Sequence, residues 1–340
     1  MNNTNSSKRP VLSNNTRNQH FLTRVEQKLN ARNPNALPEN AKIYSFRVVD
    51  RTARALQLED PNGRSIRSNL SALDLFSFDV DDGSDLRSNF ETLFAKYEAS
   101  IEVHTRNLLA KLPVRSKDIK SEVIDLFAAK LLNFVRNPYC VQKVLNTFPR
   151  LTTYQPTDPT LLAAYHRIVS GKRPHQAHLC AELGITDQMY VEWLRTLFML
   201  LFPDEKHPNL FEGLIKSLIE NPKTHTSVLV FDYDDKFCLM SDRSYCEPMP
   251  DGKHMAFSFN LCRHAFVHYI FADIDDLTQN MPRQDIVQRH RASLSEGLNV
   301  GFEKNHLKAL AMYNARVIEQ CHERVFCASK QFDVFAQPFV

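Results

Sequence analysis

Two segments far apart in the chain carry side chains that could take part in a reaction. The first, over residues 18–22, contains His20, which can act as a general base or bind a metal ion. The second ends in Ser241 and Asp242, and the carboxylate of Asp242 can bind a divalent cation, orient a histidine or accept a proton. Each segment adjoins a strand-like run, which holds side chains firmly at the edge of a cleft. If both residues are catalytic, we expect them to share one site.

Each of these residues also has a structural interpretation. His20 could bond to backbone groups and anchor the N-terminal segment. Ser241 and Asp242 could form an Asx-turn or a helix cap, which is common where a strand ends. Ser241 has no G-x-S-x-G surroundings, so the sequence does not favour a hydrolase nucleophile there.

Two glutamates and one arginine are the next candidates. Glu91 and Glu98 are seven residues apart, so they fall on similar faces of a helix and could bind a metal together. The sequence favours a solvated helix edge over a metal site for these two residues. Arg136 precedes a proline at a helix end, where it could bind phosphate bidentately, pair with Asp242, or stabilise the helix dipole.

Three further polar residues complete the candidate set. Asn314 lies in the middle of the apolar face of a late helix, so we expect it to be buried and hydrogen-bonded outside that helix. Its amide could orient His20 or Asp242, or it could fix the packing of the helix. Gln19 and Arg243 flank the two main residues and are assigned to substrate binding.

Cysteine, histidine and clustered basic residues allow weaker hypotheses. Cys262, His264 and His268 would share one face of a single strand and could bind zinc, although their spacing matches no zinc motif. The following basic residues could contact phosphate or could be a solvated surface: Arg283, Arg289, His290, Arg291, Lys304 and Lys308.

Composition narrows the class of protein. The chain has 340 residues, of which 43% are hydrophobic, so it can bury a large core. It has 8 glycines and neither a G-x-G-x-x-G nor a P-loop motif, which argues against Rossmann and P-loop nucleotide binding. The net charge of +3 means that any basic surface must be local. The seven cysteines include no C-x-x-C pair, which predicts reduced structural thiols. The sequence shows no signal peptide and no apolar run long enough to span a membrane, so it predicts a soluble cytoplasmic protein.

The order of the elements predicts an α+β fold. A small β element comes first, a helical middle follows, and C-terminal antiparallel hairpins precede a closing helix and strand. The expected strands cover 42–49, 53–58, 227–231, 237–240, 255–259, 264–271 and 324–327. The expected helices cover 86–108, 121–135, 139–148, 158–170, 175–182, 187–201, 209–220 and 302–321. Residues 1–17 are expected to be a disordered tail, and 18–340 one domain with a helical subdomain at 85–222.

The order of several short motifs resembles a known bacterial family over about residues 18–328. They are Gln19-His20-Phe21-Leu22, the helix with Glu91 and Glu98, Arg136-x-Pro138, Ser241-Asp242, and Asn314 followed by Arg324-Val325-Phe326. This set resembles the family catalogued as domain of unknown function 4238. Some of its members look like stand-alone antiphage defence proteins, so the resemblance implies a host-protective effector, and toxicity to the host cell is one way in which such an effector could act.

The function expected from the sequence is therefore cytoplasmic antiphage defence of the abortive-infection type. One hypothesis is a nuclease that cleaves RNA or DNA with Mg²⁺ or Mn²⁺, using His20 and Asp242 with Glu91 or Glu98. The alternative is a non-enzymatic sensor that recognises a phage component. The expected partners are nucleic acid or a phage protein, and not a membrane. Whether the chain is an enzyme stays open at this point.

Overall fold

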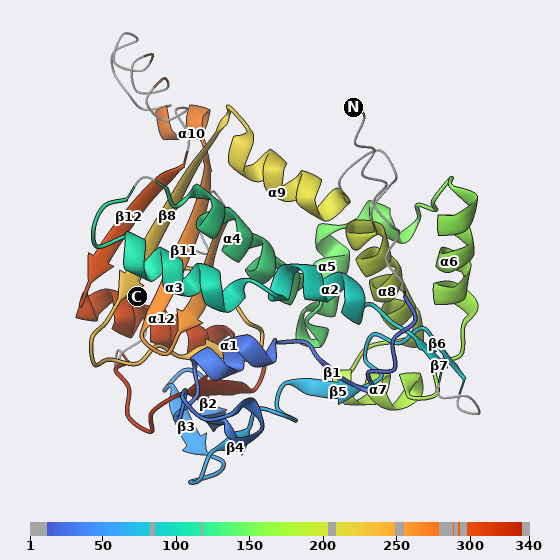
Figure 1. Cartoon of the computed structure of the whole chain (residues 1–340), viewed down its shortest axis with the longest axis horizontal. Coiled ribbons are helices and arrows are strands. Elements are labelled where there is room, and N and C mark those ends of the chain that lie inside the picture. Colours follow the sequence, from blue (N-terminus) through green and yellow to red (C-terminus); the bar gives the residue numbers. More distant parts are fainter. Residues whose placement is uncertain are drawn as a thin grey trace, which may run out of the picture. The chain divides into compact units, whose positions relative to one another are not determined.

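The computed structural model describes residues 12–81, 86–116, 118–202, 209–248, 255–278, 288, 292 and 298–334 (Figure 1). Helices and mainly antiparallel strands give an α+β fold. The chain divides into two compact units. The first contains Met1–Phe21, Leu70–Ala99 and Leu131–Leu214, and the second contains Leu22–Asn69, Ser100–Lys130 and Ile215–Val340. In the described ranges, no helix is long and apolar enough to cross a membrane.

The first unit combines two short hairpin-like pairs with most of the helices. Strand β1 (Asn18–His20) pairs antiparallel with β5 (Ser71–Leu73), and β6 (Asp79–Asp81) pairs with β7 (Leu86–Ser88). Its helices are α2 (Glu91–Glu98), α5 (Val141–Thr147), α6 (Pro159–Ser170), α7 (Gln176–Leu183) and α8 (Asp187–Leu201). Aromatic side chains fill its core, where Phe76 contacts both Phe94 and Trp193.

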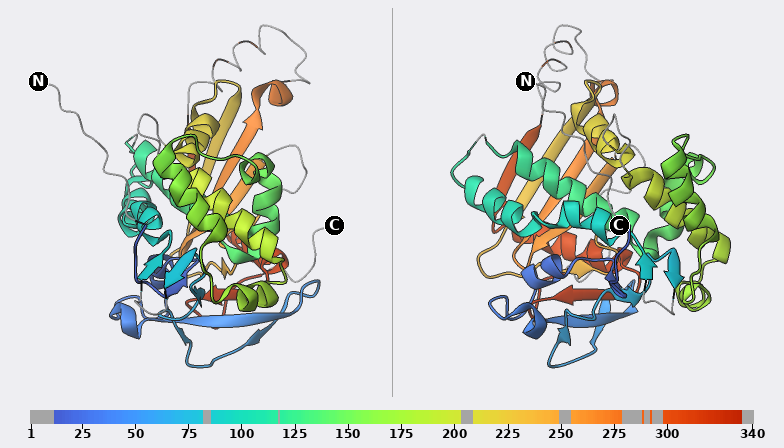
Figure 2. Two further views of the ribbon diagram at one scale, coloured as in Figure 1. Left: turned by 90° about the vertical axis from the view of Figure 1, so that its right-hand side faces the viewer. Right: turned by 45° about the vertical axis from the view of Figure 1, so that its right-hand side comes forward.

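The second unit is built on a four-stranded sheet in the order β10-β11-β8-β12. The strands are β8 (Thr224–Asp232), β10 (Met255–Cys262), β11 (Ala265–Asp273) and β12 (Asn299–Lys304), and β12 runs parallel to β8. Helix α3 (Ile101–Lys111) and the first part of α4 (Lys120–Val135) cross one face of this sheet (Figures 1 and 2).

Aromatic contacts show that helices cover both faces of the four-stranded sheet. Phe127 of α4 contacts Tyr269 and Phe271 of β11. Phe266 lies on the same strand, but its side chain points to the other face of the sheet. There its ring stacks on Tyr313 of α12 (Leu307–Gln320), with 4.1 Å between the ring centroids. Helices therefore cover the sheet on both sides, which suits the apolar runs 228–231 of β8 and 269–272 of β11.

A second sheet in this unit joins the beginning and the end of the chain. Its order is β3 (Ala55–Leu58), β2 (Lys42–Asp50), β13 (Arg324–Cys327) and β9 (Met240–Ser241), and β4 (Arg64–Ser65) also pairs with β2. Figure 2 shows the blue β2 beside the dark red β13. The remaining elements are α1 (Arg24–Leu29), α9 (Leu210–Glu220), α10 (Ile274–Thr278), and 3-10 turns at Pro38–Asn40, Pro138–Cys140 and Pro149–Thr152. The boundary between the two units falls within α4 and α9.

Most elements expected from periodicity are confirmed, and three expectations were wrong. Residues 86–88 form strand β7, and the expected long helix is two helices, α2 and α3. Residues 237–240 do not pair with β8, because β9 pairs with β13 while β8 lies between β11 and β12. Residues 302–304 belong to β12, so the last helix begins at Leu307.

The first residues of the chain also differ from expectation in part. Residues 1–11 lie outside the described residues. Leu12 is buried, Ser13 bridges to Ser88, and the backbone N–H of Asn14 donates to the carbonyl of Arg87. The stretch 12–17 of the predicted disordered tail therefore makes defined contacts instead. All seven cysteines are free in this structure.

Gly171 closes α6 at a position with no room for a side chain. Its φ of −66° and ψ of 161° suit any residue, but a Cβ atom there would overlap the carbonyl oxygens of Phe78 and Arg167. We expect Gly171→Ala to lower the free energy of unfolding by about 1–3 kcal/mol, because backbone must move. Gly213→Ala is the matched control: its Cβ meets no atom within 4 Å, so stability should not fall. Equal urea midpoints for the two variants would contradict this account.

Candidate functional site

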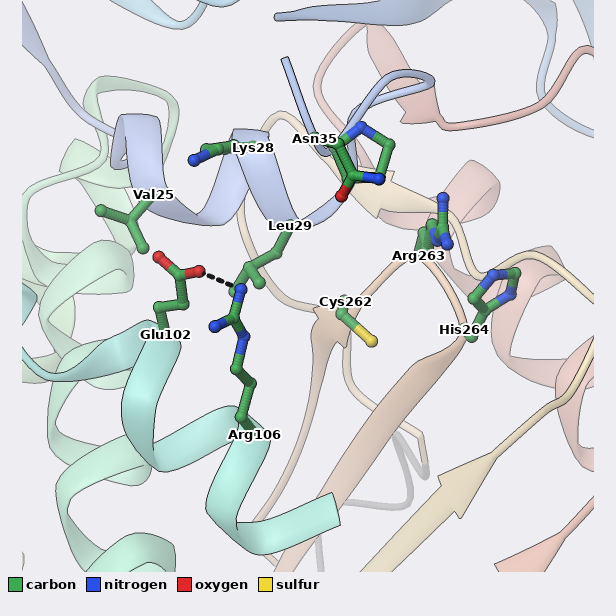
Figure 3. Close-up of a pocket in the computed structure, with 10 residues that line it drawn as sticks. Val25, Lys28, Leu29, Asn35, Glu102, Arg106, Cys262, Arg263 and His264 are labelled. Atoms are coloured by element: carbon green, nitrogen blue, oxygen red, sulfur yellow. Dashed lines mark ion pairs between the residues drawn. The ribbon is translucent and has the colours of Figure 1, made fainter. Parts of the chain in front are cut away.

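A pocket of about 240 Å³ lies in the second unit between α1, α3 and the turn that joins β10 to β11 (Figure 3). Helix α1 begins at Thr23, whose hydroxyl accepts the backbone N–H of Glu26 and caps the helix. The N–H of Arg263 donates to the carbonyl of Leu29 at 3.1 Å, which joins α1 to the turn. The pocket is lined by Val25, Lys28, Leu29, Pro34, Asn35, Glu102, Arg106, Cys262, Arg263 and His264.

Positive charge dominates the lining. Lys28, Arg106 and Arg263 come from three different elements, and the only carboxylate among the lining residues is Glu102. Glu102 pairs with Arg106 one helical turn away, at 2.5 Å. In Figure 3, Arg106 and Glu102 lie on one side of the pocket and Arg263 and His264 on the other. This arrangement suits an anion better than a cation.

The contacts of His264 fix its tautomer. Its Nδ1 atom lies 2.6 Å from the carbonyl oxygen of Lys236, and because a carbonyl only accepts, Nδ1 carries the hydrogen. In the neutral ring, Nε2 is then a hydrogen-bond acceptor. The ring also packs on Phe237, with 4.9 Å between centroids, so its orientation is held from two sides.

Cys262 supplies a neutral group to the pocket. Burial raises the pKa of its thiol, and this effect outweighs the opposing influence of the backbone N–H groups of His264 and Ala265 and of the Lys130 charge. The side chain therefore stays a thiol at neutral pH. It does not offer the thiolate that nucleophilic catalysis requires.

A buried polar network holds α1 in place. Lys130 of α4 forms an ion pair with Glu26 of α1, and their side chains are only 3% and 2% exposed. Asn30, directly after α1, donates to the side-chain oxygen of Asn260 on β10 at 2.7 Å and to the carbonyl of Glu26 at 2.9 Å. These bonds fix the position of Lys28 and Leu29 in the pocket wall.

No protein-family model, curated protein or solved structure matches this chain.

The residues selected from the sequence are divided between the two units. Gln19, His20, Glu91, Glu98 and Arg136 belong to the first unit. Asp242, Arg243 and Asn314 belong to the second. All eight are absent from the pocket lining.

In the first unit, Gln19 has a structural role. It is fully buried, donates to the carbonyl of Thr16 and to the hydroxyl of Ser77, and accepts the backbone N–H of Phe76. His20 is half-buried in β1, opposite Ser71. Gln19 therefore helps to fix the loop that follows β5.

Arg136 and Glu98 form an ion pair inside the first unit. The side chain of Arg136 is 1% exposed, donates to Asn133 at 2.9 Å and lies over the ring of Phe94 at 4.9 Å. Glu91 begins α2, where the side chain of Asn89 accepts its backbone N–H. Arg136 is thus engaged within the core and does not present its guanidinium to solvent.

Asp242 holds the corner between α12 and β13. Its side chain is 2% exposed, and both carboxylate oxygens accept backbone N–H groups: His322 at 2.7 Å, Glu323 at 2.7 Å and Arg324 at 2.8 Å. Burial raises the pKa of Asp242, while these three donors act in the opposite direction. The three backbone N–H groups surround the carboxylate in the way that backbone N–H groups surround a bound anion.

Arg51 completes the same corner from the other side. Its guanidinium donates to the carbonyl oxygens at the end of α12 and in the turn after it, those of Ile318, Glu319, Cys321 and His322. A cation at the C-terminal end of a helix stabilises the helix dipole. The backbone N–H groups of this turn are therefore bound by Asp242, and its backbone carbonyl oxygens are bound by Arg51. The side chain of Arg243, next to Asp242, is half-buried.

The expectation for Asn314 is confirmed. It is fully buried; its oxygen accepts the N–H of Leu239 at 2.8 Å, and its nitrogen donates to the carbonyls of Phe237 and Asp333 at 3.1 and 2.8 Å. The amide therefore ties α12 to the segment before β9.

The expected grouping of Cys262, His264 and His268 on one strand was wrong. Cys262 ends β10, His264 lies in the turn, and His268 belongs to β11. His268 instead hydrogen-bonds to Ser258 at 2.6 Å, and burial lowers its pKa to about 4. Within the described ranges, no three His, Cys, Asp or Glu side chains are placed to hold a metal ion, so no metal site is assigned.

The basic residues expected to contact phosphate are only partly described. Lys304 pairs with Asp234 at 2.7 Å, and Lys308 is exposed. Arg283, Arg289, His290 and Arg291 lie outside the described residues. Lys28, Arg106 and Arg263 were not found from the sequence, because each stands alone in its own segment and forms no local motif.

Proposed function

We propose that this protein is a non-enzymatic binding module whose pocket holds a phosphate-bearing ligand, and that this binding is the sensing step of an antiphage response. The convergence of Lys28, Arg106 and Arg263 on one pocket with a single carboxylate supports the binding step. Ammonium and guanidinium groups are the side chains that proteins use to bind phosphate. The defence role rests on the family resemblance.

Binding is favoured over phosphodiester cleavage by the state of the polar groups. The carboxylate of Asp242 is occupied by three backbone N–H groups, and Cys262 is a protonated thiol. The one acid in the pocket, Glu102, is paired with Arg106. General acid–base cleavage needs a group free to reach the reacting atoms. We therefore prefer the sensor over the nuclease, with a phosphate-bearing molecule that signals infection as the ligand.

Inorganic pyrophosphate is a simple probe of this proposal. We expect calorimetry to detect saturable binding, and Arg263→Ala or Arg106→Ala to weaken it about ten-fold or more, since each removes a charge-assisted hydrogen bond. Arg47→Ala is the control, because Arg47 is exposed, lies in the second unit and is absent from the pocket lining. The affinity should also fall with added salt.

Two results would overturn the proposal. One is the absence of pyrophosphate binding, or binding that the two pocket variants leave unchanged. The other is degradation of RNA or DNA by the purified protein with Mg²⁺ or Mn²⁺, provided that the activity survives both pocket substitutions. That outcome would place a catalytic centre elsewhere in the chain.

A further inference from the structure

We infer that the ligand of this pocket is a small phosphomonoester that carries a ring, of the class of nucleoside 5′-monophosphates. This inference rests on the proposed function and makes its ligand specific. It is drawn from three properties of the lining: its size, its charge, and the presence of apolar side chains beside the cationic ones.

The size of the pocket favours one small molecule over a polynucleotide. A volume of about 240 Å³ lies just below the range of roughly 300–1,000 Å³ that is usual for small-molecule sites. Proteins that bind single-stranded nucleic acid use a long cationic groove with phenylalanine, tyrosine or tryptophan rings for successive bases. None of the ten lining residues is of these three types. A single nucleotide is therefore the better match.

The charge of the pocket suits a phosphate monoester. The lining contains three cationic side chains and one carboxylate, so these four groups carry an excess of two positive charges. A phosphomonoester carries about −1.5 to −2 at neutral pH, and a phosphodiester carries about one negative charge per phosphate. A terminal phosphate therefore balances the lining more closely than an internal one.

The apolar residues provide a surface for a ring. Val25 and Leu29 of α1 and Pro34 of the following loop give aliphatic contacts, and Figure 3 places Leu29 between the two cationic sides. The amide of Asn35 and the Nε2 atom of His264 are polar groups at the same pocket, suited to the edge of a heterocycle. A few polar groups among apolar walls fix orientation in small-molecule sites.

Glu102 sets the affinity in this arrangement. The carboxylate of Glu102 forms an ion pair with the guanidinium of Arg106, so a bound phosphate must compete with Glu102 for that guanidinium. It also repels a second anion placed in the pocket. Glu102→Gln keeps the size of the side chain and removes the charge. We expect this variant to bind nucleoside monophosphates about two-fold to five-fold more tightly, in the range of a single exposed ion-pair contribution.

Titration calorimetry with the full chain tests the inference. The ligands are AMP, GMP, CMP, UMP, ribose 5-phosphate, adenosine, inorganic phosphate and a 5′-phosphorylated octanucleotide. We expect at least one mononucleotide to bind about ten-fold or more tightly than ribose 5-phosphate, through burial of the ring. Adenosine should bind at least as weakly as inorganic phosphate. Leu29→Ala should weaken mononucleotide binding while inorganic phosphate binds as before.

The outcomes separate this inference from the function on which it rests. If all phosphate compounds bind equally and Leu29→Ala has no effect, the anion pocket stands but the nucleotide class is wrong. If the octanucleotide binds more tightly than every mononucleotide, the ligand is a polynucleotide and the inference fails. If no phosphate compound binds, the proposed function fails as well. An unchanged affinity in Glu102→Gln would remove the assigned role of Glu102.

Discussion

Asp242→Ala is expected to lower the free energy of unfolding by about 3–5 kcal/mol, because three backbone N–H groups lose their acceptor at once. The groups belong to His322, Glu323 and Arg324, at the corner between α12 and β13. This corner also carries the pairing of β13 with β2 and β9, so its loosening affects the whole second sheet. The effect should appear as a lower denaturant midpoint with little change in slope.

Two variants control for this result. Asp242→Asn retains one acceptor oxygen, so its loss should be smaller than that of alanine. Asp235→Ala changes an exposed aspartate nearby in the chain and should stay within about 0.5 kcal/mol of the wild type. A catalytic role for Asp242 predicts the reverse pattern, in which Asp242→Ala keeps normal stability and loses a nucleic-acid-cleaving activity.

Lys130→Met should cost about 3–5 kcal/mol of stability, because it leaves the carboxylate of Glu26 buried without its cation. The exposed pair of Lys216 and Glu220 on α9 provides the comparison. Lys216→Met should change stability by no more than about 0.5 kcal/mol, since solvent screens that pair. Thermal unfolding of the three proteins at one pH gives the ranking.

A double variant tests the mechanism of the Lys130 effect. Lys130→Met combined with Glu26→Met removes both charges and fills similar space, so it should recover most of the stability lost by Lys130→Met alone. If the double variant is as unstable as the single one, the loss comes from packing and not from an unpaired carboxylate. Because Glu26 lies on α1, the single variant should also weaken pyrophosphate binding.

Local periodicity predicted much of this fold, and pairing between distant strands was the main source of error. The helices over α4 to α9 each have one apolar face and a proline or cap at an end, so their positions could be found from the sequence. Asn314 could be predicted because one polar residue in an apolar face must be satisfied. The partner of β8 could not, since short loops suggest hairpins while β12 joins from far along the chain.

The candidate site was harder to predict for the same reason. The pocket forms only when α1, α3 and the β10–β11 turn pack together in the folded chain. Until then, nothing in the sequence places Lys28, Arg106 and Arg263 near one another. Asp242 was prominent in the sequence because acids after strands can be catalytic, but they bind backbone N–H groups equally well. Cys262 and His264 were selected from the sequence as zinc ligands. In the structure both line the pocket, where Cys262 is a neutral thiol and His264 is oriented by the carbonyl of Lys236.

The pairing of β2 with β13 has a consequence for synthesis of the chain. Tyr44 to Arg47 find their hydrogen-bonding partners in Arg324 to Cys327, which a ribosome makes much later than β2. Contacts between such distant residues slow folding, and they leave β2 with an unpaired edge for most of translation. That nascent edge is open to chaperones or to pairing with other chains. Premature stop codons shortly before residue 324 would therefore release an aggregation-prone product, although every residue of the pocket lining had already been made.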